Sequence, residues 1–165
     1  MLKLLSYLAA IVMLRQGPQD LPAARSLLPT CLTLYLVITL VSFGTGQRPE
    51  NLPMVMALAV ALPLALSWIV LKLANHLARW EQTVSALFGT SALLSAVSLP
   101  VSLMAGTEPT PPLALMLLGV FFWSFAVDAH IWRNALQVSF ATGLALAVIL
   151  FSVTLFVINT LAGPL

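Results

Sequence analysis

Two polar stretches in an otherwise apolar sequence carry the side chains that could do chemistry. Each holds a histidine, a carboxylate and an arginine, a set that could in principle bind a divalent metal ion. The residues of this polar cluster are His76, Arg79, Glu81, Asp128, His130 and Arg133. Their spacing disfavours a metal site, because positions five apart or two apart do not share one face of a helix. We therefore interpret both stretches as polar helix ends at a membrane surface, and we expect neither a metal ion nor another cofactor.

Asp128 is the most informative single residue of this cluster. It follows the apolar run 125–127, so we expect it just inside the edge of the hydrocarbon layer. An ionised carboxylate is costly there and usually has a partner or a task. Arg133, Arg79 and His76 are the candidate partners. Our hypothesis is that an ion pair between Asp128 and Arg79 ties the two polar stretches together.

Small residues at helical spacing predict close helix packing rather than catalysis. The sequence has no GxSxG, HExxH or P-loop pattern, and no histidine or lysine lies near its serine-rich stretch. We therefore do not expect an enzyme. Pairs of small residues four apart let another helix approach closely. The predicted packing residues are Ser85, Gly89, Ser91, Ser95, Ser139, Gly143 and Ala147.

The composition indicates a membrane protein. Of 165 residues, 61% are hydrophobic and only 7% are charged, whereas a soluble domain has about 25% charged residues. This number of charged residues is too small to cover the surface of a soluble fold. We therefore expect lipid around most of the surface. A net charge of +2 is too small to imply nucleic acid. The single cysteine, Cys31, excludes an internal disulfide.

Hydropathy and turn signals predict an all-α, polytopic membrane protein with five transmembrane helices. Loops rich in glycine and proline interrupt the apolar run at 44–51 and 106–112. The five-helix transmembrane domain, 23–161, has approximate spans at 23–43, 52–73, 83–104, 113–131 and 136–161.

The segment 1–16 is predicted to be a short amphipathic helix in the membrane interface. Its apolar residues recur at helical spacing between Lys3 and Arg15, and the run is too short to span. A cleaved signal peptide is the alternative, although no A-x-A site follows the run.

The distribution of basic residues predicts the orientation. One side of the predicted topology carries Lys3, Arg15, Arg25, Lys72, Arg79 and Arg133, and the other carries Arg48. Since basic residues favour the cytoplasmic side, we expect a bacterial inner (plasma) membrane protein with a cytoplasmic N-terminus and a C-terminus outside.

Two stretches resemble the bacterial members of the Yip family of Ypt/Rab-interacting membrane proteins. They are ARWEQTVSALFGTSALLSAVSLPV at 78–101 and LLGVFFWSFAVDAHIWRNALQVSFATGLALAV at 117–148. In that family a polar entry leads into a small-residue helix, and a later helix carries an aromatic residue and a polar exit before a last span. The matching positions are Gln82, Thr83, Gly89, Trp123, Ser124 and Arg133.

The resemblance implies five spans, a cytoplasmic N-terminus and a non-catalytic membrane factor. Eukaryotic relatives, which have a long cytoplasmic N-terminal region, act as membrane adaptors for small GTPases. This sequence has no such region, so we do not expect a GTPase partner.

Three functions follow from the sequence, in order of preference. The first is a scaffold or accessory subunit that packs against other integral membrane proteins, or against itself, in the lipid bilayer. The second is a small transporter or channel component. The third is a membrane-embedded enzyme that acts on lipid.

Overall fold

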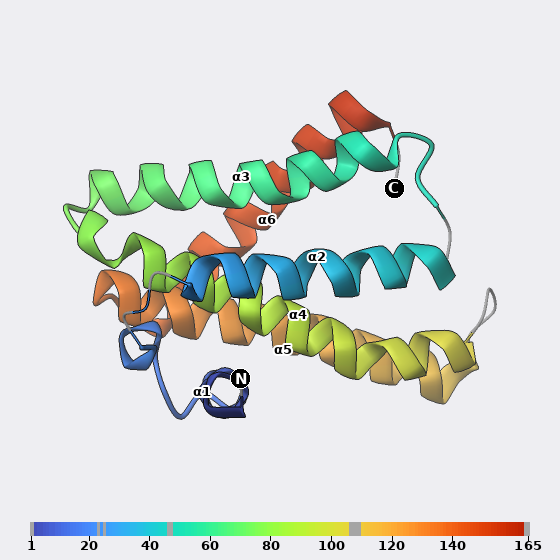
Figure 1. Cartoon of the computed structure of the whole chain (residues 1–165), viewed down its shortest axis with the longest axis horizontal. Helices are drawn as coiled ribbons and strands as arrows, with labels where there is room; N and C mark the ends of the chain where they lie inside the picture. Colours follow the sequence, from blue (N-terminus) through green and yellow to red (C-terminus); the bar gives the residue numbers. More distant parts are fainter. Residues whose placement is uncertain (1, 23, 25, 46–47, 106–109, 164–165) are drawn as a thin grey trace.

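The computed structural model describes residues 2–22, 24, 26–45, 48–105 and 110–163. In these residues the elements, in chain order, are α1 (Leu2–Val12), η1 (Pro18–Asp20), α2 (Leu27–Thr45), α3 (Leu52–Leu73), η2 (Leu77–Arg79), α4 (Trp80–Ala105), α5 (Pro111–Leu136) and α6 (Phe140–Ala162) (Figure 1).

The chain is an all-α, polytopic membrane protein, as its sequence predicts. Helices α2 to α6 are long and apolar enough to cross a bilayer, and α1 is a shorter apolar helix. They contain 19 to 26 residues. At 1.5 Å per residue they are about 28–39 Å long, against a hydrocarbon core of about 30 Å.

Helix α5 continues more than one turn beyond its predicted end at 131. Two contacts explain where it stops. The Arg79 Nη1 atom donates hydrogen bonds to the carbonyl oxygens of Asn134 and Ala135, at 3.2 and 3.0 Å. These bonds satisfy carbonyls that have no partner within the helix. Gln137 then adopts a left-handed conformation with φ 58° and ends the helix. The second polar stretch is therefore helical throughout.

The spanning helices form two groups that α6 connects (Figure 1). Helix α4 packs against α2 on one side and α5 on the other, while α3 packs mainly against α6. Helix α6 starts beside the end of α5 and crosses diagonally toward the start of α3. We call the end of the bundle with Lys72, Arg79 and Arg133 the basic end, and the opposite end the far end.

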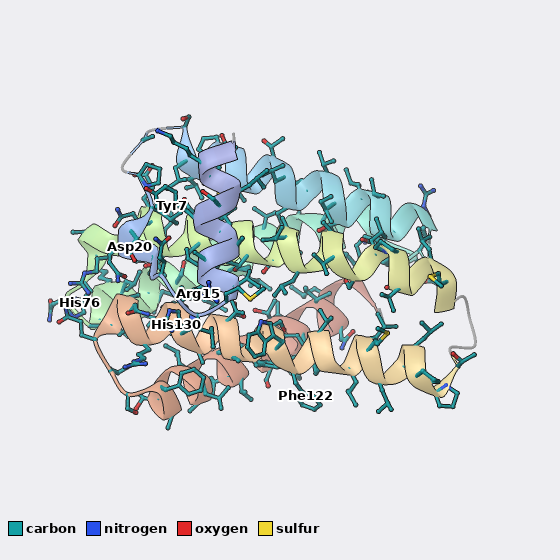
Figure 2. All side chains as sticks on the ribbon, turned by 90° about the horizontal axis from the view of Figure 1, so that it is seen from below. Tyr7, Arg15, Asp20, His76, Phe122 and His130 are labelled. Carbon is teal, nitrogen blue, oxygen red and sulfur yellow. The ribbon has the colours of Figure 1, made fainter. Side chains whose placement is uncertain are left out.

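Helix α1 crosses over α4 and α5 (Figure 2). Its Leu8 and Ile11 side chains are buried against the bundle. The indole Nε1 of Trp123 donates a hydrogen bond to the Val12 carbonyl at 3.0 Å. His130 lies beneath the end of this segment, and its Nε2 atom is 3.0 Å from the Gln16 carbonyl. The N-terminal segment is thus held by specific contacts as well as by apolar packing, and its position in the membrane interface stays a prediction.

Two small apolar clusters join α3 to the rest of the bundle. The basic-end cluster consists of Leu71, Trp132, Ala135 and Ala147, from α3, α5 and α6. The far-end cluster consists of Val55, Ile158 and Ala162, from α3 and α6. Between them, Val60 and Leu64 of α3 pack against the largest buried cluster, and Trp80 Nε1 donates hydrogen bonds to the Leu64 carbonyl at 3.3 Å and to Ser67 Oγ at 3.1 Å.

Candidate functional site

A cavity of about 160 Å³ lies where all five spanning helices meet. Along α3 its lining runs from Ala59 to Leu66, and along α6 from Ala147 to Thr154. Ala147 also belongs to the basic-end cluster, and these segments extend from there toward the far-end cluster. The cavity therefore lies in the middle of the membrane-spanning region, with apolar packing toward each end of the bundle.

Among the described residues that line this cavity, Asp128 is the one with a charged side chain. It lies eight residues before the end of α5, which is about 12 Å along the helix axis. In the part of the chain that the structure describes, its carboxyl group has no hydrogen bond and no ion pair. The side chain is half-buried, and a carboxylate held away from water is normally paired because leaving it unpaired is costly. This site thus contains a polar group without a partner.

The hypothesis of an ion pair between Asp128 and Arg79 is wrong. Arg79 instead bonds to carbonyls at the end of α5. Those carbonyls are six and seven residues beyond Asp128, about 10 Å along the helix. The guanidinium group is therefore used in ending the helix and lies outside the cavity.

Two hydroxyl groups in the cavity, like Asp128, have no hydrogen-bond partner among the described residues. Most hydroxyls of the spanning helices donate to a carbonyl three or four residues earlier, as Thr83, Ser85 and Thr90 do. The side chains of Ser91 and Thr154 line the cavity. Neither makes a hydrogen bond to any described residue. Both hydroxyls are free to bond to a molecule inside the cavity.

Pro63 adds a further acceptor to the wall. It lies inside α3 and lines the cavity together with Ala59. Proline has no N–H, so the carbonyl of Ala59 lacks its usual helical donor. A backbone oxygen without a partner is tolerated in a membrane only where it faces protein or a cavity. The interruption of α3 therefore coincides with the site.

Aromatic rings from four helices complete the wall. They are Tyr35 of α2, Phe88 of α4, Trp132 of α5 and Phe151 of α6. The rings of Tyr35 and Phe88 are in contact, with centroids 5.0 Å apart. The cavity thus combines a carboxyl group and several polar acceptors with a largely aromatic and aliphatic surface.

The predicted packing residues lie mostly at contacts within the chain. A Cβ atom on Gly89 would lie 2.6 Å from Leu8 Cδ2 and 3.2 Å from Cys31 Sγ, so α1 and α2 approach α4 there. On Gly143 it would overlap the carbonyl oxygen of Ala129, where α5 and α6 meet. Ala147 is buried in the basic-end cluster.

The four predicted serines have different environments. Ser85 is buried, Ser91 lines the cavity and Ser95 is half-buried. Ser139 is exposed and caps α6, because its Oγ accepts a hydrogen bond from the Thr142 backbone N–H at 3.1 Å. The serines therefore do not form one packing surface.

The predicted polar cluster divides into separate parts. Asp128 lines the cavity, whereas His130 and Arg79 make contacts that hold α1 and α5. His76 is half-buried at the turn after α3, and Glu81 and Arg133 are exposed. No three histidine, cysteine, aspartate or glutamate side chains gather as a metal site in the described ranges.

Several cavity residues could not have been selected from the sequence. Pro63 gave a signal, because a proline in mid-span predicts a local break in the helix. Tyr35, Trp132 and Thr154 gave none, since aromatic and hydroxyl residues are common throughout spanning helices. Their role depends on which faces of the helices meet.

Searches of protein-family models, of curated proteins and of solved structures find no match to this chain. The resemblance to the bacterial Yip family stays a prediction.

Proposed function

We propose that this chain is a small membrane transport protein whose substrate site is the central cavity. The observation that carries the proposal is Asp128, an unpaired carboxyl group in a cavity that all five spanning helices line. Ionisable groups within a membrane domain are costly, and they commonly mark the path of a substrate or an ion.

The backbone hydrogen bond that α3 lacks at Pro63 supports the same function. Transport proteins commonly bind substrate near the middle of the membrane, beside helices with a break in their hydrogen bonding. Pro63 provides such a break in the cavity wall. It also gives α3 a point at which to bend. Bending there would loosen α3 at one apolar cluster while the other stays packed, which would open the cavity toward one end at a time.

The scaffold role has less support. The sequence suggested it because small-residue faces on α4 and α6 appeared available to other proteins. At Gly89 and Gly143 those faces are already in contact with α1, α2 and α5. A role as a scaffold or accessory subunit stays a prediction, and no contact described above favours it.

We also propose that the basic end faces the cytoplasm of a bacterial inner membrane. Lys72, Arg79 and Arg133 lie there, whereas Arg48 is the basic residue of the described far end. The positive-inside tendency favours this orientation. It leaves the end of α6 on the outer side.

Water access to the cavity tests the transport role without knowledge of the substrate. In a Cys31→Ala background, Ser91→Cys and Thr154→Cys each place a thiol in the cavity wall. Thr90→Cys is the matched control, since Thr90 is buried beside Ser91 on the same helix. We expect a membrane-impermeant thiol reagent to label the two cavity positions at least about tenfold faster than the control, because thiols react as hydrated thiolates.

Labelling of Ser91→Cys and Thr154→Cys no faster than Thr90→Cys, from both sides of inverted and right-side-out vesicles, would exclude a transport path through this cavity.

A further inference from the structure

The cavity wall has the chemistry of a cation site. Asp128 supplies one formal negative charge, and no arginine, lysine or histidine is among the lining residues. In a membrane interior a carboxylate is stabilised by a positively charged partner. The described residues supply none, so a cation that binds from outside the chain would complete the site.

The aromatic residues distinguish an organic cation from a metal ion. The faces of aromatic rings attract cations, tryptophan most strongly, and proteins recognise ammonium groups with such rings. Tyr35, Phe88, Trp132 and Phe151 line the cavity together with the carboxyl group. A hard metal ion such as Ca²⁺ takes about six to eight oxygen ligands. Most of the wall is aromatic and aliphatic surface rather than oxygen ligands.

The cavity is partly open, so its volume describes the part of a ligand that the wall can surround. A cavity of about 150 Å³ in another protein holds benzene. At about 160 Å³, this cavity suits a molecule of similar size. An ammonium group with a few carbon atoms meets both the size and the chemistry of the wall.

We propose that the cavity binds a small organic ammonium cation, with the charged nitrogen at Asp128 and the carbon substituents against the aromatic rings. The assignment rests on the proposed transport role of the same cavity, and it names the class of substrate. If the cation carries N–H groups, the hydroxyls of Ser91 and Thr154 are available to accept hydrogen bonds from them.

Binding to the purified protein in detergent tests the class of ligand. Three probes are used: n-butylammonium, 1-butanol and NaCl. The first two have similar size and shape and differ in charge. We expect n-butylammonium to bind at least about tenfold more tightly than 1-butanol in calorimetric titration, because a desolvated charge pair contributes strongly to affinity.

Two variants assign the binding to the carboxyl group. Asp128→Asn keeps the size of the side chain and removes its charge, so n-butylammonium affinity should fall about tenfold or more. Glu81→Gln is the matched control, because it makes the same change at an exposed position. It should change the affinity less than about twofold. If Asp128→Asn does not fold, the comparison of charged and neutral probes on the unchanged protein still decides the question.

Equal binding of 1-butanol and n-butylammonium would overturn the proposal, as would unchanged affinity in Asp128→Asn. Binding of Na⁺ that depends on Asp128, without binding of the ammonium probe, would also overturn it. Ammonium binding without faster labelling of Ser91→Cys would leave the ligand class intact and exclude transport. Fast labelling without ammonium binding would leave the transport role intact and exclude the ligand class.

Discussion

The two faces of α5 differ in how their polar groups are satisfied. On the face that meets α1, Trp123 and His130 both bond to carbonyls of the N-terminal segment. On the face that lines the cavity, Asp128 has no partner among the residues described, although it lies two positions before His130. A polar group paired within the chain holds the fold together, whereas an unpaired one in apolar surroundings costs stability. The difference separates a structural face from a candidate binding face.

The largest expected effect comes from separating α6 from α5. Gly143→Ala adds a Cβ atom that would overlap the Ala129 carbonyl, so we expect a loss of about 1–3 kcal/mol in the free energy of unfolding. Gly119→Ala is the matched control on α5, where a Cβ atom meets nothing within 4 Å. It should be neutral or stabilising by up to about 1 kcal/mol. Unfolding in mixed detergent micelles measures both changes, and similar values would contradict the close contact at Gly143.

The next largest effect is a gain in the free energy of unfolding, and it is expected on the face of α5 that lines the cavity. Asp128→Leu replaces an unpaired carboxyl group with an apolar side chain, so the protein without ligand should gain about 1–2 kcal/mol of stability. The same variant should lose ammonium binding. Glu81→Leu at the exposed start of α4 should change stability by less than about 0.5 kcal/mol. A destabilised Asp128→Leu protein would show that the carboxyl group has a structural role after all.

A smaller loss of stability is expected on the face of α5 that meets α1. Trp123→Phe keeps a ring and removes the donor to the Val12 carbonyl, which should cost about 0.5–1.5 kcal/mol. Backbone amides of α1 should then exchange hydrogen faster, while ammonium affinity stays unchanged. Trp68→Phe is the control, since that indole is exposed on α3. Unchanged exchange in α1 would show that the bond to Trp123 does not hold the helix.

The sequence predicted the spanning helices well because lipid imposes one simple requirement, an apolar length sufficient to cross it. It predicted Gly143 as a close-packing position for a similar reason, since small residues four apart have few other uses in such helices. It did not predict that the partner of Gly143 is α5 of the same chain. That depends on how the helices are arranged.

Asp128 shows most clearly what could not be predicted from the sequence. Its position in an apolar run identified it as unusual, but the expected partner Arg79 was wrong. The prediction ended the fourth span near 131, which brought both side chains to the same membrane edge. In the structure α5 continues to Leu136, so Asp128 lies deeper and Arg79 meets the final carbonyls instead. An error of five residues in a helix end thus changed the expected chemistry of the site.

The contacts of α1 have a consequence for biosynthesis. Its hydrogen-bonding partners Trp123 and His130 lie 111 and 114 residues further along the chain than the carbonyls they meet. These two bonds can therefore form only after the fourth span has been translated. Formation of these bonds therefore reports that α5 is in place beside α4.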